Sequence, residues 1–401
     1  MSKNVKINNT VYSGVESVKL QTEGGGTAVF YDRDAQPSEL DINFWDYDGT
    51  LLYAWTLAEL AAKTELPPLP SHDGLICQGW NWTLADIKSE GRAVDVGANY
   101  ITDDGKTRIY IHLEEGRTSP MLGCCPNGTV TVDWGDGTTP DVLTGTSITT
   151  VKWTPTHAYA APGDYVITLM VDGSFSFCGE GAVNTGGAFR CASGADTRNA
   201  VYQRAVQKIE LGSGITSLGE HSFRCFSSLR SITIPASLIS IGGSVFFRCY
   251  SLNVVTIPSA VSKIGSFALS CCLALTHVAS AKASPIMTTQ NFNGSLSIAR
   301  IQIPEGTNAI GSSALEACTG LSSLTIPSSV TSIAARAFYN CTGIKFYDFT
   351  GHTAVPTLTD ANAFTGIAAD CEIRVPAALA EEWKAATNWS SLAEHIVGVE
   401  A

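Results

Sequence analysis

The second half of the chain repeats with a period of 23 residues, and this repeat constrains the fold more strongly than any other feature of the sequence. An apolar residue recurs at this interval without a slip, at Ile209, Ile232, Val255, Val278, Ile301, Leu324 and Tyr347. In six of these seven units a second apolar residue follows two positions later, with Ser280 as the exception. Side chains two positions apart on a strand lie on the same face. Each unit is therefore predicted to open with a short strand.

Three later positions of the unit are also apolar. They lie nine residues after the start (Leu218, Ile241, Ile264, Met287, Ile310, Ile333), fourteen residues after it (Phe223, Phe246, Leu269, Phe292, Leu315, Phe338) and twenty residues after it (Leu229, Leu252, Leu275, Ile298, Leu321, Ile344). The segment between the last two positions is predicted to be a short helix or an irregular return. A unit of this size cannot bury its own apolar side, so the units are expected to stack into a solenoid with one continuous core. Six full coils at a strand spacing of ~4.8 Å give a body on the order of 30 Å long.

Cysteine recurs at one position of the repeat, seventeen residues into the unit. This column reads Phe226, Cys249, Cys272, Ser295, Cys318 and Cys341, and it accounts for four of the twelve cysteines of the chain. Metal sites need cysteine pairs that converge with a spacing of two to four residues, and the sequence holds no Cys-x-x-Cys. The column is therefore predicted to pack in the core as small hydrophobic side chains, without a metal or a cofactor.

The residues at these positions resemble the leucine-rich repeats of BspA-like bacterial surface antigens. The shared pattern is a strand followed by Ile-Pro, then Ile-Gly, Ala-Phe, Cys and Leu, and it covers roughly residues 205–375. The tail, with Cys371-Glu-Ile-Arg-Val-Pro and Glu381-Glu-Trp-Lys, resembles the last coil and capping helix of that family. The unit from Val278 to Arg300 departs from the pattern, because Ala281 replaces the proline and serines stand at apolar positions. This fourth coil is expected to be the loosest.

The residues before the repeat show the alternation of a β-sandwich. Thr129-Val-Thr-Val-Asp-Trp-Gly-Asp-Gly-Thr138 leads into an Asp-Gly turn, and a strand-like Gly163-Asp-Tyr-Val-Ile-Thr-Leu169 follows. Over about residues 106–173 these motifs resemble the polycystic kidney disease (PKD) domain, an immunoglobulin-like spacer. That resemblance implies structural roles for Asp133, Asp136 and His157. A calcium site at the two aspartates is the minor alternative, because the loop offers too few of the six to eight oxygens that calcium needs.

The first hundred residues hold short alternating runs, which predict a small β module. Asp46-Tyr-Asp48-Gly-Thr-Leu51 matches the start of haloacid dehalogenase-like phosphatases, whose first aspartate is a phosphoryl nucleophile. The neighbouring segments lack the βα succession of that fold, so a hairpin turn is the favoured interpretation. Four tryptophans are expected to form the core of this module, or to stack on sugars if they are exposed: Trp45, Trp55, Trp80 and Trp82.

Composition supports a folded, mainly β protein. Apolar residues make up 44% of the chain and charged residues 15%, while 37 glycines and 16 prolines favour turns. The formal charge of −12 argues against nucleic acid as a partner. The N-terminus lacks the apolar stretch of a secretory signal, and no apolar run reaches the roughly 20 residues of a membrane span. We therefore expect no export by that route and no membrane insertion.

These features together predict a multidomain, mainly β chain in four parts. They are a β-rich attachment module (1–105), a PKD-like sandwich (106–175), a hairpin or linker (176–204) and the leucine-rich repeat solenoid with its C-terminal cap (205–401).

The part order resembles that of phage or prophage tail-fibre proteins, which implies a receptor-binding protein rather than an enzyme. The solenoid is expected to recognise a bacterial surface protein or glycan, and the N-terminal module to join other tail or surface-assembly proteins, with a homotrimer by analogy. Arg224, Arg248 and Tyr250, together with the fourth coil, are the candidate contacts. A bacterial cell-surface adhesin is the second hypothesis, and the Asp46 phosphatase is the third.

Overall fold

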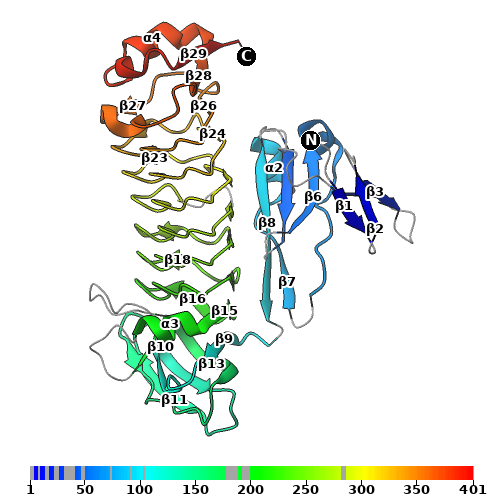
Figure 1. Cartoon of the computed structure of the whole chain (residues 1–401), viewed down its shortest axis with the longest axis vertical. Coiled ribbons are helices and arrows are strands. Elements are labelled where there is room, and N and C mark those ends of the chain that lie inside the picture. Colours follow the sequence, from blue (N-terminus) through cyan, green and yellow to red (C-terminus); the bar gives the residue numbers. More distant parts are fainter. Residues whose placement is uncertain are drawn as a thin grey trace.

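The computed structural model describes residues 4–7, 10–13, 18–21, 27–30, 41–46, 50–72, 75–90, 93–102, 104–177, 188–191, 199–280 and 286–400. These residues form a β-solenoid whose base is closed by a layer of strands and whose other end is closed by short helices (Figure 1). A smaller module lies beside the solenoid (Figure 1). The prediction of a mainly β solenoid with 23-residue coils and a short C-terminal helix is confirmed.

Eight strands mark the successive coils. They are β15 (Val206–Glu210), β17 (Ser231–Thr233), β19 (Val254–Ile257), β21 (His277–Ser280), β22 (Arg300–Ile301), β24 (Ser323–Thr325), β26 (Phe346–Asp348) and β28 (Glu372–Pro376). From β15 to β22, and between β24 and β26, neighbouring strands are parallel and paired in the 23-residue register, as in Ile209 with Ile232 and Val255 with Val278. The last pair, β26 with β28, is also parallel but has a spacing of 26 residues.

A second series of strands lies nine residues into the unit, or eleven in the last one. It contains β16 (Ile215–Leu218), β18 (Ser240–Ile241), β20 (Lys263–Ile264), β23 (Ala309–Ile310), β25 (Ser332–Ile333) and β27 (Thr357–Leu358). These strands form two ladders, β16–β18–β20 and β23–β25–β27. In the described coils, the segment predicted as a short helix or an irregular return is made of turns.

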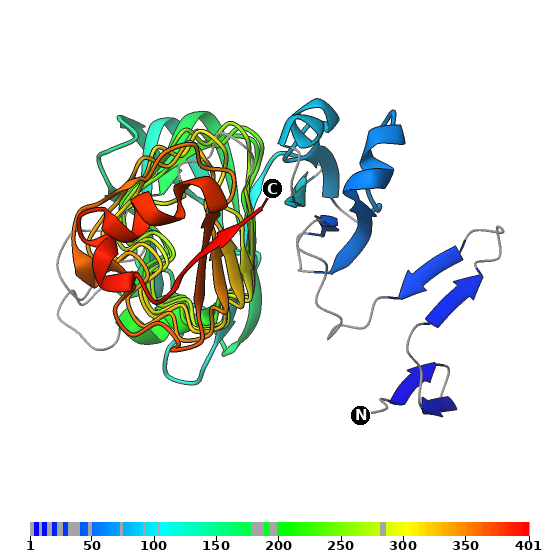
Figure 2. The ribbon, with the colours of Figure 1, turned by 90° about the horizontal axis from the view of Figure 1, so that it is seen from above.

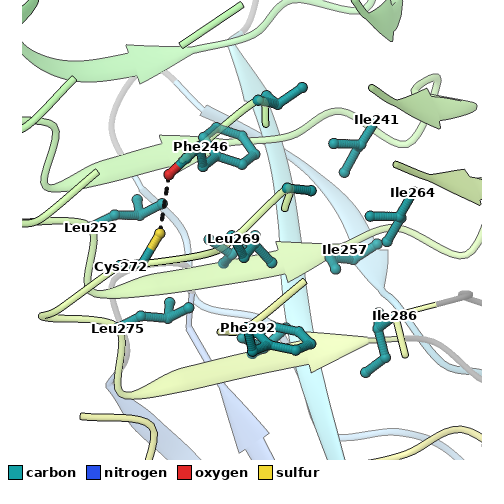
Figure 3. Packing of buried hydrophobic residues seen from close by; sticks show 14 of the residues in the cluster. Ile241, Phe246, Leu252, Ile257, Ile264, Leu269, Cys272, Leu275, Ile286 and Phe292 are labelled. Carbon is teal, nitrogen blue, oxygen red and sulfur yellow. Dashed lines mark hydrogen bonds between the residues drawn. The ribbon is translucent and has the colours of Figure 1, made fainter. Parts of the chain in front are cut away.

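The thirteen repeat-core residues named from the sequence are all buried, with at most 6% of any of them exposed. They are Ile209, Ile232, Val255, Val278, Ile301, Leu324, Phe223, Phe246, Phe338, Cys249, Cys272, Cys318 and Cys341. Figure 3 shows part of this core, where apolar side chains from successive coils stack on one another.

The cysteine column also forms hydrogen bonds between coils. The Cys272 Sγ donates to the Phe246 carbonyl at 3.2 Å (Figure 3). Cys249, Cys318 and Cys341 make the same contact with the carbonyl 26 residues earlier. Burial raises the pKa of the Cys272 and Cys341 thiols, so they stay protonated and able to donate. Ser295 replaces cysteine in the fourth coil and keeps this bond, because its hydroxyl donates to the Leu269 carbonyl at 2.8 Å.

Each coil turns through two left-handed residues, at positions twelve and sixteen of the unit. The first column is His221, Ser244, Phe267, Gln290, Ser313 and Arg336, and the second is Cys225, Arg248, Cys271, Gly294, Ala317 and Asn340, all with φ between 53° and 71°. The second column aims its backbone N–H groups at the next coil. Ala317, for example, donates to the Tyr339 carbonyl at 2.8 Å. The hydrogen bonds between coils thus hold conformations that side-chain-bearing residues ordinarily avoid.

We expect Ala317→Gly to stabilise the protein by about 0.5–1 kcal/mol. Glycine removes the left-handed penalty of about 1–2 kcal/mol, and the larger entropy of its unfolded chain offsets part of that gain. Ala299→Gly is the control, since Ala299 is exposed and has no positive φ. It should destabilise by about 0.5–1 kcal/mol. Urea unfolding measures both, and a loss of stability in Ala317→Gly would contradict the strain argument.

The base of the solenoid is closed by strands that precede the repeat. Antiparallel β9 (Thr107–Leu113) and β13 (Gly163–Phe177) pair with the first strands of the two series, β15 and β16. Phe177 reaches the first coil, with its ring centroid 5.1 Å from that of Phe223. The remaining elements here are β10 (Pro120–Asp133), β11 (Asp141–Thr146), β12 (Lys152–Trp153), β14 (Phe189–Cys191) and α3 (Asn199–Ala205). Strand β13 runs past residue 175, so the sheet continues from this part into the first coil.

The other end is closed by α4 (Ala380–Ala385), which lies across the last coils (Figure 2). Trp383 and Trp389 are fully buried there, and their ring centroids lie 4.7 Å apart. The Trp389 Nε1–H donates to the Pro356 carbonyl at 2.8 Å. Short elements flank the helix: η1 (Ala361–Phe364), η2 (Ala377–Leu379), η3 (Trp389–Leu392) and β29 (Ile396–Val399).

Residues 41–102 form the module beside the solenoid. Its sheet has the order β6-β5-β8-β7 and includes β5 (Asp41–Trp45), β6 (Leu51–Thr56), β7 (Leu75–Trp80) and β8 (Val94–Thr102). One face of the sheet buries Phe44 and Val96 in a core that includes residues of α1 (Leu57–Ala62) and α2 (Leu84–Glu90). Two hairpins precede this sheet, β1–β2 (Asn4–Ile7, Thr10–Ser13) and β3–β4 (Val18–Gln21, Thr27–Phe30).

Strand β8 of the module packs on the solenoid strands β17, β19 and β21. The approach is close at Gly97, where a Cβ atom would lie 2.7 Å from both Ala279 Cβ and Thr256 Cγ2. The Trp82 Nε1–H donates to the Ser280 carbonyl at 2.6 Å. The outward-facing Thr233, Thr256, Ala279 and Gln302 of four successive coils are buried.

The centre of this contact is charged. Asp95 of β8 is buried between the module and the solenoid. Its Oδ2 lies 3.1 Å from Arg300 Nε, and its Oδ1 lies 3.0 Å from the indole Nε1 of Trp45. Burial alone would raise the pKa of Asp95, but Arg300 and the neighbouring donors hold it below its usual value. His277 packs against the Trp45 ring, and burial lowers its pKa to about 4. The docked state therefore holds a charged aspartate and a neutral histidine.

We expect Gly97→Val to weaken docking, because its side chain would overlap Ala279 and Thr256. The free energy of unfolding should fall by about 1–3 kcal/mol. The Asp95 amide, which donates to Gln302 Oε1 at 2.9 Å, should exchange its hydrogen faster. Gly351→Val is the matched control, since a Cβ at Gly351 meets no atom within 4 Å. Equal behaviour of the two variants would contradict the close packing.

Acidification should also weaken docking. A solvated His277 takes up a proton near pH 6.5, whereas the docked one does so only near pH 4. The stabilisation of the docked state by neutral His277 is therefore fully present above pH 6.5. It is lost as the pH falls to about 4, which lowers the free energy of unfolding by about 3 kcal/mol. In His277→Gln, which cannot titrate, the unfolding free energy should vary less over this window. An identical pH profile in the two proteins would contradict this assignment.

Candidate binding surface

Docking of the module leaves a different side of the first four coils open. This side, which we call the return edge, comprises the exposed side chains at positions fifteen to twenty-one of each unit. The ranges are 224–230, 247–253, 270–276 and 293–299. Every third residue of these turns is buried, as Phe246, Cys249 and Leu252 are, whereas Arg248 and Tyr250 on either side of Cys249 are exposed.

The structure brings two of the three candidate residues together. The guanidinium carbons of Arg224 and Arg248 lie 4.9 and 5.0 Å from the ring centroid of Phe247, within the range of cation–π contact. Phe267 meets the same ring edge-on at 6.3 Å. The half-buried Phe247 therefore holds two positive charges from adjacent coils at one place on the return edge.

Tyr250, the third candidate, lies in an open hollow of about 550 Å³ rather than against Phe247. The hollow is lined by Arg230, Ser231, Tyr250, Ser251, Asn253, Val254 and Ala274. The Asn253 Oδ1 accepts a hydrogen bond from Thr276 Oγ1 at 2.8 Å, which orients the amide of Asn253. An aromatic ring, a guanidinium, an amide and hydroxyl groups thus share one concave site.

Tyr250 also begins an exposed apolar column. Leu273 and Leu296 occupy the same position in the next two coils, and the three side chains are 41%, 42% and 44% exposed. The sequence analysis did not single out Leu273 and Leu296. Their position in the unit, one residue after the buried cysteine column, is the signal that could have identified them.

The fourth coil was also a candidate contact. Residues 281–285, which include Ala281, lie outside the described residues. Ser280 and Ser295 are buried, and both make the hydrogen bonds given above. The small Ala279 and Ser280 lie where the module packs. The coil's departure from the repeat pattern therefore coincides with the docking contact.

Asp133, Asp136 and His157 fix the turn after β10. Asp133 accepts the Gly135 N–H at 2.9 Å, and one oxygen of Asp136 accepts from the backbone and hydroxyl of Thr138. The other Asp136 oxygen lies 2.8 Å from His157 Nε2. Across the described residues, no group of three His, Cys, Asp or Glu side chains is placed to hold a metal ion.

The phosphatase-like motif lies at the β5–β6 hairpin. Asp46 is buried, and its Oδ2 lies 2.9 Å from His72 Nε2. The chain then returns as antiparallel β6, whereas that chemistry requires a βα unit after the motif. Asp48, and Asp103 of the Asp103-Asp104 pair that would hold the metal of such a phosphatase, lie outside the described residues. Asp104 pairs with Arg108 and Lys106 at the surface.

The four tryptophans of the module serve two purposes. The Trp55 and Trp80 rings pack on Phe44 in the module's core, while Trp45 and Trp82 reach the solenoid. Sequence reasoning missed Asp95, His277 and Arg300, because docking alone brings Asp95 to the neighbouring pair of His277 and Arg300. Within the described part of the chain, no helix is long and apolar enough to cross a bilayer.

Comparison with known proteins places the repeat but not the module. The family model described as "BspA type Leucine rich repeat region" matches residues 197–284, 216–345 and 270–368. A search of curated proteins found no match.

Solved structures with similarity include a leucine-rich repeat protein from Eubacterium ventriosum. It is 23% identical, with a TM-score of 0.33, and the alignment covers 39% of this chain and 42% of that one. A leucine-rich repeat protein from Bacteroides ovatus is 20% identical, with a TM-score of 0.26, and the alignment covers 50% of this chain and 68% of that one. A leucine rich cell surface protein from Faecalibacterium prausnitzii is 18% identical, with a TM-score of 0.22, and the alignment covers 45% of this chain and 76% of that one. This chain thus spans less than half the length of the first of these structures. Residues 197–368 match the BspA type of leucine-rich repeat, as the motifs of the sequence indicated.

Proposed function

We propose that this chain is a non-enzymatic binding protein that recognises a bacterial surface protein or glycan through the return edge of its solenoid. The observation that carries the proposal is the division of the solenoid's surface. The module packs on β17, β19 and β21 and reaches Arg300 and Gln302, and the return edge stays open with Arg248, Tyr250 and Leu273 exposed. Arginine and tyrosine are the residue types that most often dominate binding energy at interfaces.

We further propose a place for the chain in a phage or prophage tail fibre, attached through its N-terminal residues. The hairpins β1–β2 and β3–β4 lie beyond the module, away from the solenoid (Figure 2). That arrangement supports a division between an attaching end and a recognising end, with the strands of 106–175 as a PKD-like base. Attachment of the same N-terminal hairpins to a bacterial envelope would make the protein an adhesin.

The test is binding of the full chain to intact bacterial cells. Cells of a recognised strain should bind it saturably, and Arg248→Ala/Tyr250→Ala should weaken binding at least tenfold, because truncating such residues typically costs more than about 1.4 kcal/mol. The control is Lys263→Ala, which removes an exposed charge from the same coils on the β16–β18–β20 ladder. Equal binding by the double variant and the control would move recognition away from the return edge. No saturable binding to any strain would contradict the function.

A further inference from the structure

Charge is distributed unevenly along the solenoid. Residues 221–304 contain six lysines and arginines and not one aspartate or glutamate. This stretch has a formal charge of +6 in a chain of −12, so the other residues together carry −18. An uninterrupted basic stretch within an acidic chain indicates a surface suited to a negatively charged partner.

The structure places half of these charges on the return edge. Arg224 and Arg248 flank Phe247, and the exposed Arg230 lines the hollow beside Tyr250. Arg300, by contrast, pairs with Asp95 at the docking contact. Lys263 lies on the β16–β18–β20 ladder, and Lys282 is outside the described residues.

The edge changes character where the acidic residues resume. In the fifth coil, at position fifteen of the unit, stands Glu316, and Arg336 of the next coil donates to its carboxylate. An arginine there is committed to a carboxylate of the protein itself. Within residues 221–304 the sequence supplies no such carboxylate, so Arg230 and Arg248 have none nearby in the chain.

The uncharged groups of the edge fit a sugar. The Tyr250 ring offers an apolar face, and the hydroxyls of Ser231 and Ser251 with the Asn253 amide offer hydrogen bonds. Leu273 and Leu296 continue the apolar column along the next coils. Because this apolar position recurs from coil to coil, the column suits a polymer of repeating sugar units that extends from the arginines of the first two coils.

We propose that the return edge of coils one to four binds a carboxylate-bearing polysaccharide, an inference that rests on the function proposed above and names its ligand class. Arginine pairs with carboxylates through two parallel hydrogen bonds, which gives Arg230 and Arg248 a specific role. Tyr250 and the leucines contact the apolar faces of the sugar rings.

The experiment measures binding of the full chain to immobilised polygalacturonate, with neutral dextran as the reference polymer. We expect saturable binding to polygalacturonate at least tenfold tighter than to dextran, and weaker binding as salt rises. Arg230→Gln/Arg248→Gln should lose at least tenfold in affinity for polygalacturonate, since each charge-assisted contact contributes substantially. Lys263→Gln, from the same coils, should bind as the parent protein does. Matched thermal unfolding of all three proteins shows that the fold is intact.

Three results would overturn the ligand class: equal affinity for both polymers, an unchanged double variant, or an equal loss in Lys263→Gln. An equal loss in Lys263→Gln would mean that binding depends on net charge and not on the two arginines. Measuring binding to intact cells in parallel separates the two proposals. If the parent protein binds cells but does not bind polygalacturonate, the proposed function stands and the polysaccharide is ruled out as its ligand. Absence of both kinds of binding removes the function itself.

Discussion

The hydrogen bonds that join each coil to the next determine the rest of this structure. Each coil sends backbone N–H groups from its two left-handed corners and its strands to carbonyls one coil away. This ladder holds the 23-residue register, and the register in turn places every position of the repeat in a column. The buried cysteines, the stacked phenylalanines and the exposed Tyr250–Leu273–Leu296 series are all consequences of the same spacing. A shift of one residue would move an entire column from the core to the solvent.

The sequence allowed prediction of those parts of the fold that repeat. Columns such as Ile209–Ile232 and Cys249–Cys272 could be read because the same physical demand recurs at a fixed interval. The left-handed corners could not, because His221, Cys225 and Phe267 are not residue types that ordinarily mark such turns. The hydrogen bonds between coils impose those conformations, and the local residue types do not predict them. For the candidate site, Arg248 and Tyr250 were identifiable as non-core positions, but the hollow and the role of Phe247 depend on contacts between coils.

Docking of the module was beyond the reach of sequence patterns for a different reason. His277 and Arg300 occupy one column of the repeat, whereas Trp45 and Asp95 belong to a module that does not share its period. Their chemistry becomes evident only when the two sheets face each other. The docking also gives a reason for the irregular fourth coil. Ser280 breaks the apolar pattern, and its carbonyl accepts the Trp82 hydrogen bond, while the small Ala279 next to it lies at the close approach of Gly97.

The docking contact also sets an order of events during synthesis. Trp82 and Ser280 are 198 positions apart, and Asp95 and Gln302 are 207 apart. At translation rates of about 5–20 residues per second, the module waits roughly 10 to 40 s for the coils on which it packs. Its two faces suit such a delay. The apolar face around Phe44 and Val96 is covered by the module's own residues, while Asn43, Asp95 and Asn99 on the other face tolerate water until the fifth coil forms. The module is thus synthesised before the solenoid but docks on it only after the coils have formed.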